Sequence, residues 1–297
     1  MANAQQRPVY RFAPTPNGRL HLGHAYSALI NAQSAERFGG RLLLRMEDLD
    51  RSRCKPAYEM AAIEDLAWLG LTFEPSIRRQ SEHPADYEAA YRDLEAQGLL
   101  YPCFCAKSEI EKASAAAGLG HDPDGAPLYP GTCRARRIEA PQGAARALRL
   151  DMARALARAP RELFWREFGE GERERLQRAD PAAWGDIALK RRGAAATYHV
   201  AVVVDDALQG VTDAMRGRDL FAATSLHRLL QELLKLPAPR YRHHRLVLDA
   251  KGEKMSKSAS STPLVRLRQE GVSAADIRAA LGFAPAPAQP RLAVRLS

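Results

Sequence analysis

The sequence predicts an α/β protein whose parallel sheet is divided by an inserted segment. Strand and helix patterns alternate toward both ends of the 297-residue chain, which is typical of parallel sheets. The middle breaks this alternation and contains three of the four cysteines. The length suits one large domain or two smaller ones, and 46% hydrophobic with 27% charged residues is ordinary for a globular protein.

The first part of the chain, residues 1–100, is predicted to form the first half of the sheet. Residues 9–12 favour a short strand, which prolines and a glycine then end. A helix is expected to begin near Gly23, to place small apolar residues on one face and to end at a glycine pair. Residues 41–46 contain three consecutive leucines, which suit a buried parallel strand, and another helix is expected around residues 61–69.

The middle of the chain, residues 101–183, is predicted to be an insertion rather than more of the sheet. It contains a stretch rich in glycine, proline and aspartate at residues 118–131, together with a dense mixture of arginine and glutamate. Glycine and proline interrupt regular structure. We therefore expect this segment to form a separate part of the protein.

The alternating pattern resumes in residues 184–236, the predicted second half of the sheet domain. Residues 199–204 (His-Val-Ala-Val-Val-Val) predict a β-branched strand that ends at two aspartates. A helix near residues 220–236 follows and ends before two prolines. The final segment, residues 237–297, has only 39 residues after Ser258, and we expect two short helices and a tail there.

Charge and cysteine content define the expected environment. The chain carries 44 Lys and Arg residues against 35 Asp and Glu, a formal net charge of +9. Thirty-six of the basic residues are arginine, which reflects either biased base composition or affinity for nucleic acid. There is no run of 18 apolar residues and no N-terminal signal segment, so we expect a cytoplasmic protein that does not bind membranes. Its cysteines then favour a metal or free thiols over disulfides.

Two histidines lie where an open parallel sheet binds its ligands. The chain has neither of the common glycine-rich phosphate loops, but His21-Leu22-Gly23-His24 falls between the first strand and the first helix. The N–H groups of a helix N-terminus suit a polyphosphate, both histidines can face it, and Gly23 leaves room for it. Taken alone, such histidines are more often surface or capping groups.

A basic loop near the C-terminus is the second candidate phosphate contact. Residues 254–258 (Lys-Met-Ser-Lys-Ser) contain two lysines and two hydroxyl groups that can wrap a pyrophosphate through charge-assisted hydrogen bonds. The alternative interpretation is a solvated turn. Together, this loop and the histidine pair resemble the KMSKS and HIGH signatures of the class I aminoacyl-tRNA synthetases. The resemblance implies a Rossmann-like catalytic domain that uses ATP with Mg²⁺.

Further segments narrow the resemblance. Four stretches are similar to the glutamyl- and glutaminyl-tRNA synthetases of that class, namely residues 11–24, 41–50, 185–206 and 209–220. The similarity covers roughly residues 8–262. It implies an enzyme of the ligase type that binds L-glutamate and ATP.

The resemblance also implies roles for individual residues. The expected catalytic residues are His21, His24, Lys254 and Lys257. The expected ATP contacts are His21, Gly23, His24 and Lys257. The expected glutamate contacts are Arg11, Phe12, Ala13, Pro14, Thr15, Glu47, Tyr198 and Arg216. Arginines can grip a carboxylate in fork geometry, a phenol can add a hydrogen bond, and a carboxylate can pair with the α-ammonium group. Without the resemblance, an ordinary ion pair is the usual interpretation of Arg11 and Glu47.

Three cysteines of the insertion predict one structural zinc ion per chain. Cys103 and Cys105, followed by Tyr129 and Cys133, resemble the zinc site of the short glutamyl-Q tRNA(Asp) synthetases, and three thiolates suit tetrahedral zinc. The loop before Tyr129 is longer than expected and contains His121, the second candidate for the fourth ligand. Free thiols without a metal are the alternative.

The short C-terminal segment favours the shortened paralogues over the full-length synthetases. Full-length enzymes continue into an anticodon-binding domain, which 39 residues cannot form. The glutamyl-Q tRNA(Asp) synthetases are implied to convert glutamate to glutamyl-adenylate and to transfer it to queuosine, the wobble base of tRNA(Asp). No obligate protein partner is evident. The alternatives are a shortened glutamyl-tRNA synthetase that charges a tRNA 3′ end, a glutamate-adenylating transferase with a non-tRNA acceptor, and a non-catalytic RNA-binding paralogue.

Overall fold

The computed structural model describes residues 7–136, 146–169, 173–248 and 262–284. The chain divides into two compact units, one of residues 1–78 with 244–297 and one of residues 79–243. Both units contain strands and helices, and pairs of parallel strands confirm the predicted α/β class. Within the described ranges, no helix has the length and apolar character that crossing a membrane requires.

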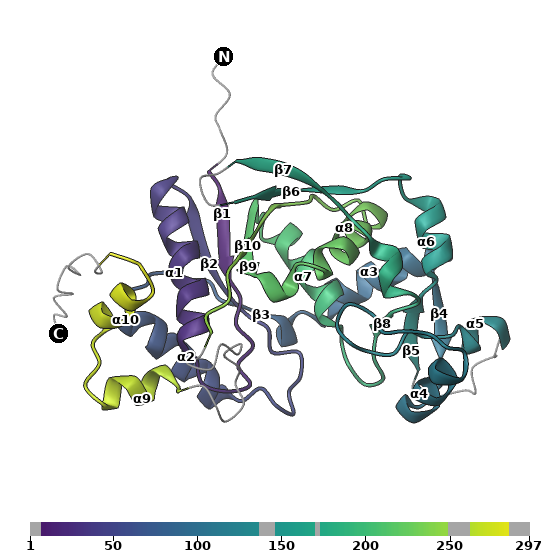
Figure 1. Cartoon of the computed structure of the whole chain (residues 1–297), viewed down its shortest axis with the longest axis horizontal. Helices are drawn as coiled ribbons and strands as arrows, with labels where there is room; N and C mark the ends of the chain where they lie inside the picture. The colour runs from purple at the N-terminus through teal and green to yellow at the C-terminus, as the bar shows by residue number, and fades with distance from the viewer. Residues whose placement is uncertain (1–6, 137–145, 170–172, 249–261, 285–297) are drawn as a thin grey trace, which may run out of the picture. The chain divides into compact units, whose positions relative to one another are not determined.

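The first unit is built around two parallel strands (Figure 1). Strands β1 (Val9–Phe12) and β2 (Arg41–Met46) have the predicted bounds, and they pair in parallel with Arg11 opposite Leu43. All of β1 and all but the first residue of β2 are buried, as expected for parallel strands. Helix α1 (Leu22–Arg37) connects the strands, packs along both and confirms the predicted helix.

Three further helices and a minimal strand complete this unit. Helix α2 (Pro56–Trp68) begins earlier than predicted, because a proline at the first helical position loses no hydrogen bond. Strand β3 (Arg78–Arg79) has two residues. The two short C-terminal helices are α9 (Leu264–Gln269) and α10 (Ala274–Ala280), which confirms the expected pair. The Arg278 guanidinium attaches α10 to the end of α2 by donating to the carbonyl that follows Trp68, 3.2 Å away.

The second unit contains strands in two arrangements. Strands β4 (Leu100–Cys103), β5 (Ala147–Leu150) and β8 (Ala188–Lys190) form an antiparallel sheet. Strands β9 (Asp213–Gly217), β10 (Arg240–His244), β6 (Phe164–Phe168) and β7 (Glu174–Arg178) lie side by side in that order. Strand β10 runs parallel to β6, and β6 pairs with β7 as an antiparallel hairpin.

The expectation that residues 101–183 add no sheet is therefore wrong. Strands β5, β6 and β7 lie in this segment, and β4 overlaps its start. Burial alternates along β6, and every residue of β7 has some exposure. Such strands are held by cross-strand pairing and carry no long apolar run, so composition alone did not reveal them.

The helices of the second unit precede β4 or lie between the strands along the chain. They are η1 (Gln80–Glu82), α3 (Pro84–Ala96), α4 (Lys107–Ala116), α5 (Thr132–Arg136), α6 (Met152–Arg158), η2 (Pro181–Trp184), α7 (Tyr198–Leu208), η3 (Arg218–Leu220) and α8 (Ala223–Leu233). Helix α8 confirms the helix predicted near residues 220–236, with a shorter extent.

The strand predicted at residues 199–204 is wrong, because these residues belong to α7. Every residue from 199 to 206 is buried, so the run has no one-sided pattern that separates a strand from a helix. Helices α3 and α8 pack against α7. The buried carboxylate of Asp205 accepts hydrogen bonds from Gln80 at 2.8 Å and from Tyr87 at 3.0 Å, which makes a charge tolerable inside this helix.

Candidate active site

His21 and His24 lie together at the N-terminus of α1. The Nδ1 atom of His21 accepts the N–H of Gly23 at 3.1 Å, and the Nδ1 atom of His24 accepts the N–H of His21 at 3.2 Å. The ring centroids are 3.9 Å apart. Because a backbone N–H only donates, each neutral ring carries its proton on Nε2. The pair therefore presents two Nε2–H donors at a helix N-terminus, which is the chemistry that phosphate oxygens require.

The missing side chain of Gly23 leaves room for the ring of His21. A Cβ atom at this position would lie 3.0 Å from Cε1 and 3.1 Å from Nδ1 of His21. The expected space for a phosphate beside Gly23 stays a prediction. The missing side chain lets the His21 ring close over the first turn of α1 and cap it.

The lysines of the basic loop, Lys254 and Lys257, lie outside the described residues. The chain that follows this loop is described. Pro263 forms an antiparallel bridge with His21, and the next backbone N–H donates to the carbonyl of Leu20 at 2.9 Å. Residues 263–264 therefore lie beside the first histidine of the pair.

The predicted glutamate contacts of the first unit cluster at the ends of β1 and β2. Arg11 is buried within β1, and residues 12–15 continue from it. Glu47 directly follows β2, and its backbone N–H donates to the carbonyl of Pro14 at 3.0 Å. The Glu47 carboxylate lies 3.5 Å from the guanidinium of Arg45, so an ion pair with a neighbour on β2 is present. Carboxyl ends of parallel strands are where open α/β sheets bind ligands.

The predicted contacts of the second unit, Tyr198 and Arg216, are brought together. Arg216 lies on β9 and is 5% exposed, whereas Tyr198 begins α7 and is half-buried. The Nη1 atom of Arg216 donates to the Tyr198 hydroxyl at 3.1 Å. The guanidinium also lies over the ring of Tyr241, 5.1 Å from its centroid.

Three further residues hold the same guanidinium, and sequence reasoning missed all of them. Arg216 Nε lies 3.2 Å from Nε2 of His243, Nη1 lies 3.1 Å from Nδ1 of His227, and Nη2 donates to Thr224 Oγ1 at 2.7 Å. The available signal was the presence of polar rings within otherwise apolar runs, as at His199 and His227. These residues come from α8 and β10, so only the fold shows that they meet.

The electrostatics of Arg216 favour an anionic ligand. In the described chain, its hydrogen-bond partners are a phenol, a hydroxyl and two imidazoles, and none of them is a carboxylate. A buried charge without a direct counter-ion is costly. A bound carboxylate would supply the missing negative charge.

The carboxylate of Glu167 is separated from Arg216 by the ring of His243. Glu167 accepts hydrogen bonds from the backbone N–H of His243 at 3.0 Å, from its Nδ1 at 2.9 Å and from the indole of Trp165 at 2.9 Å. Burial raises the pKa of Glu167, but these hydrogen bonds outweigh it, so the pKa falls below its usual value.

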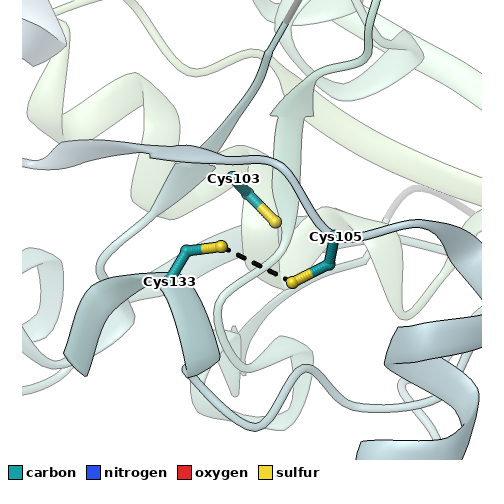
Figure 2. A group of neighbouring side chains, drawn as sticks. All are labelled: Cys103, Cys105 and Cys133. Carbon is teal, nitrogen blue, oxygen red and sulfur yellow. Dashed lines mark hydrogen bonds between the residues drawn. The ribbon is translucent and has the colours of Figure 1, made fainter. Parts of the chain in front are cut away.

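The cysteines form a compact cluster. The sulfur atoms of Cys103, Cys105 and Cys133 all lie within 4.8 Å of one another, and Figure 2 shows the three side chains turned toward a common centre. The hydroxyl of Tyr129 lies 3.5 Å from Cys103 Sγ and 3.4 Å from Cys105 Sγ. Gly131, with φ of 77° in the left-handed region that favours glycine, turns the chain between Tyr129 and Cys133.

The two candidates for a fourth ligand have different positions. Tyr129 is 8% exposed, and its hydroxyl accepts the N–H of Cys133 at 2.8 Å. His121 is exposed and forms a bridge with Pro127. Among the described residues, the metal-ligating group contains only the three cysteines and does not include His121. The geometry therefore brings Tyr129, and not His121, to the thiols.

The thiols differ in their acidity. Burial raises the pKa of Cys105 to about 11, aided by the Cys133 thiol. At Cys133 burial also raises the pKa, but hydrogen bonds from Tyr129, the Phe104 N–H and the other thiols outweigh it and lower the pKa to about 7. Burial and hydrogen bonding to the sulfurs raise the pKa of Tyr129 above its usual range. Without a bound cation, Cys133 thus ionises before Cys105.

The chain is similar to known tRNA synthetases. A family model described as tRNA synthetases class I (E and Q), catalytic domain, matches residues 9–273. A glutamyl-Q tRNA(Asp) synthetase of Rhodobacter capsulatus is 42% identical over 284 residues, 93% of this chain and 100% of that protein. One from Leptothrix cholodnii is 42% identical over 262 residues, 88% of this chain and 86% of that protein.

Solved structures show the same fold. The crystal structure of a glutamate-tRNA synthetase from Elizabethkingia anophelis matches with a TM-score of 0.67 and 25% identity over 85% of this chain. This chain covers 53% of that synthetase.

The fold and the family match define a ligase of the class I tRNA synthetases (E and Q). Within this class, the chain belongs to the family of the glutamyl-Q tRNA(Asp) synthetases, as the identity over nearly the whole chain establishes.

Proposed function

We propose that the protein activates L-glutamate with ATP and transfers the glutamyl group to queuosine at the wobble position of tRNA(Asp). The observation that carries the glutamate assignment is Arg216, a buried cation with no carboxylate among its direct partners in the described chain. Arg216 thus provides a binding site for an anionic group, and the chain belongs to a family of ligases. The queuosine acceptor is supported by the names of the relatives.

In the first step, an α-carboxylate oxygen of glutamate attacks the α-phosphorus of ATP. An oxygen–phosphorus bond forms, the bond to the bridging oxygen breaks, and pyrophosphate leaves. The Nε2–H groups of His21 and His24 would donate to phosphate oxygens, and Lys254 and Lys257 would add positive charge. Mg²⁺ bound to the phosphates would neutralise their charge further. Catalysis of this kind consists of positioning and charge stabilisation.

Glutamate is proposed to be held by its charged groups. Arg216 and Tyr198 would bind a carboxylate, with Arg11 as a further cation. Glu47 would pair with the α-ammonium group, and residues 12–15 would contribute backbone and hydroxyl contacts. In the second step, a hydroxyl of the queuosine cyclopentene ring attacks the acyl carbon, AMP leaves, and the hydroxyl proton is lost.

The cysteine cluster is proposed to hold a structural zinc ion. Tetrahedral zinc about 2.3 Å from each sulfur separates the sulfurs by roughly 3.8 Å. The three sulfurs of this chain lie within 4.8 Å of one another, so the donor set fits. Cys103, Cys105, Cys133 and Tyr129 would be the ligands, and the ion would link the end of β4 to α5.

The test follows radiolabelled glutamate. ATP–pyrophosphate exchange is measured with glutamate, with and without RNA. Labelled glutamate is then offered with tRNA(Asp) from a queuosine-making strain and from a queuosine-deficient strain, which is the matched control. We expect exchange with glutamate, label only in the queuosine-containing tRNA, and recovery of the label on the anticodon fragment after nuclease digestion.

Each alternative gives a different result. Label on the 3′-terminal adenosine would identify a shortened glutamyl-tRNA synthetase. Exchange without labelling of any RNA would indicate a non-tRNA acceptor. Absence of exchange would contradict glutamate activation and favour an RNA-binding protein.

A further inference from the structure

Most of the N–H donors of Arg216 form hydrogen bonds with other side chains of the protein. A guanidinium has five N–H donors. Four engage partners in the described chain: Nε with His243, Nη1 with Tyr198 and His227, and Nη2 with Thr224. One Nη2 donor remains for a ligand. The orientation of that donor depends on the groups that hold the other four.

The contact with His227 defines the protonation of a buried pair of rings. Arg216 only donates, so Nδ1 of His227 accepts, and the neutral ring carries its proton on Nε2. Nε2 lies 3.2 Å from Nδ1 of His199, which therefore accepts. His199 then carries its own proton on Nε2, which faces the carboxylate of Asp124 at 3.7 Å. His199 and His227 are 7% and 0% exposed, so both rings are shielded from water.

The contact with Arg216 also defines the tautomer of His243, which is opposite to that of His227. Nε2 of His243 faces the Nε donor of Arg216 at 3.2 Å and must accept. The proton of the neutral ring then lies on Nδ1 and is donated to Glu167 at 2.9 Å. Protonation of either ring at the atom that faces Arg216 would remove an acceptor and place two cationic donors against each other.

We infer that His227 and His243 are positioning residues for the glutamate carboxylate, which they serve by orienting Arg216 without neutralising it. This inference rests on the proposed glutamate activation. A carboxylate at either place would also hold the guanidinium, but it would cancel the charge that attracts the substrate. Neutral imidazoles accept the same hydrogen bonds and leave the positive charge available. The carboxylates Glu167 and Asp124 lie behind the imidazoles of His243 and His199, one or two rings away from Arg216.

Three substitutions of His227 separate the orientation of the Arg216 guanidinium from the neutralisation of its charge. H227L removes the acceptor, H227Q keeps a neutral acceptor, and H227E supplies a charged one. We expect the KM for glutamate to rise roughly tenfold or more in H227L, the effect of losing one hydrogen bond to a charged group. We expect a similar rise in H227E and a value close to wild type in H227Q. The KM for ATP should not change in any of them.

The matched control is S225A. Ser225 lies on the same helix, is 7% exposed and accepts the N–H of Asp180 at 3.0 Å, but it is not among the hydrogen-bond partners of Arg216 in the described chain. Thermal unfolding of each variant reports the loss of stability. S225A should keep the KM for glutamate. The tautomers are read separately from the imidazole ¹⁵N shifts of the wild-type protein, with His227 protonated on Nε2 and His243 on Nδ1.

The outcomes distinguish this inference from the proposed function. An unchanged KM for glutamate in a folded H227L variant would overturn the inference alone, as would equal behaviour of H227Q and H227E. Opposite tautomers would also overturn it. Absence of glutamate-dependent exchange in the wild-type protein would overturn the proposed function, and the positioning role with it.

Discussion

Histidine side chains have two opposite hydrogen-bonding roles in this protein. At the start of α1, backbone N–H groups occupy Nδ1 of His21 and His24, so the outward nitrogen of each ring is a donor. Around Arg216, the guanidinium occupies one nitrogen of His227 and of His243, so the nitrogen that faces it is an acceptor. The first arrangement suits an anion directly, and the second prepares a cation to bind one.

The phosphate role of His24 can be separated from its capping role. In H24N, the amide oxygen can still accept the N–H of His21, but the Nε2 donor is gone. We expect H24N to remain folded and to lose about 10²–10³-fold in pyrophosphate exchange, the usual cost of one transition-state contact. H24A is the comparison that loses both roles. Near-normal exchange in H24N would show that the ring serves only as a cap.

Glu167 is expected to make stability depend on pH. Its pKa is lowered in the folded protein, so its contribution is present above the unfolded value near 4.5 and is lost as the pH falls through the folded value. E167Q should therefore be less stable than the wild type at pH 7, by about 1–3 kcal/mol for a buried charged acceptor. The difference should shrink in acid. Denaturant titrations at both pH values measure it, and a constant difference would contradict the assignment.

At the level of elements, the first turn of α1 accommodates the histidine pair at some cost to the stability of the helix. Glycine is a poor helix former, yet Gly23 occupies the first turn because a Cβ would meet the His21 ring. Helix α7 also contains residues with low helix propensity, but for another reason. Its run of β-branched residues forms a helix where packing covers every side.

Substitution of Gly23 should separate stability from activity. G23A favours the helix by up to about 1 kcal/mol, but the new methyl group displaces the His21 ring. We expect little loss of thermal stability together with at least a roughly tenfold loss of exchange, because a small displacement of a phosphate contact is costly. Exchange and thermal unfolding are measured on the same sample. Normal exchange in G23A would contradict the requirement for this ring position.

At the scale of the whole molecule, the cysteine cluster joins segments that are distant in sequence. Cys103 ends β4 and Cys105 follows it, whereas Cys133 lies on α5. The Tyr129 hydroxyl contacts all three residues. The Arg149 guanidinium covers the Tyr129 ring, 3.7 Å from its centroid, and extends this packing to β5. A metal here would stabilise the second unit.

Metal analysis tests this arrangement. Protein purified without chelator should contain about one zinc per chain, Y129F should retain less, and H121A should match the wild type. Removal of zinc should increase amide exchange in β4 and α5, while β1 and α1 stay protected. Loss of zinc in H121A but not in Y129F would identify the histidine as the ligand instead. Absence of zinc from the wild type would favour free thiols.

The sequence by itself determined the features that depend on local pattern. Strands β1 and β2, helix α1 and the position of His21 and His24 at its start follow from breakers, apolar runs and short spacings. The spacing of the cysteines indicated a cluster, which the fold then brought together with Tyr129. Only the tertiary structure decided that residues 199–204 are helical, because a run buried on all sides carries no period that separates helix from strand. It alone decided the surroundings of Arg216, because those hydrogen-bond partners come from elements that are distant in sequence and meet only through packing.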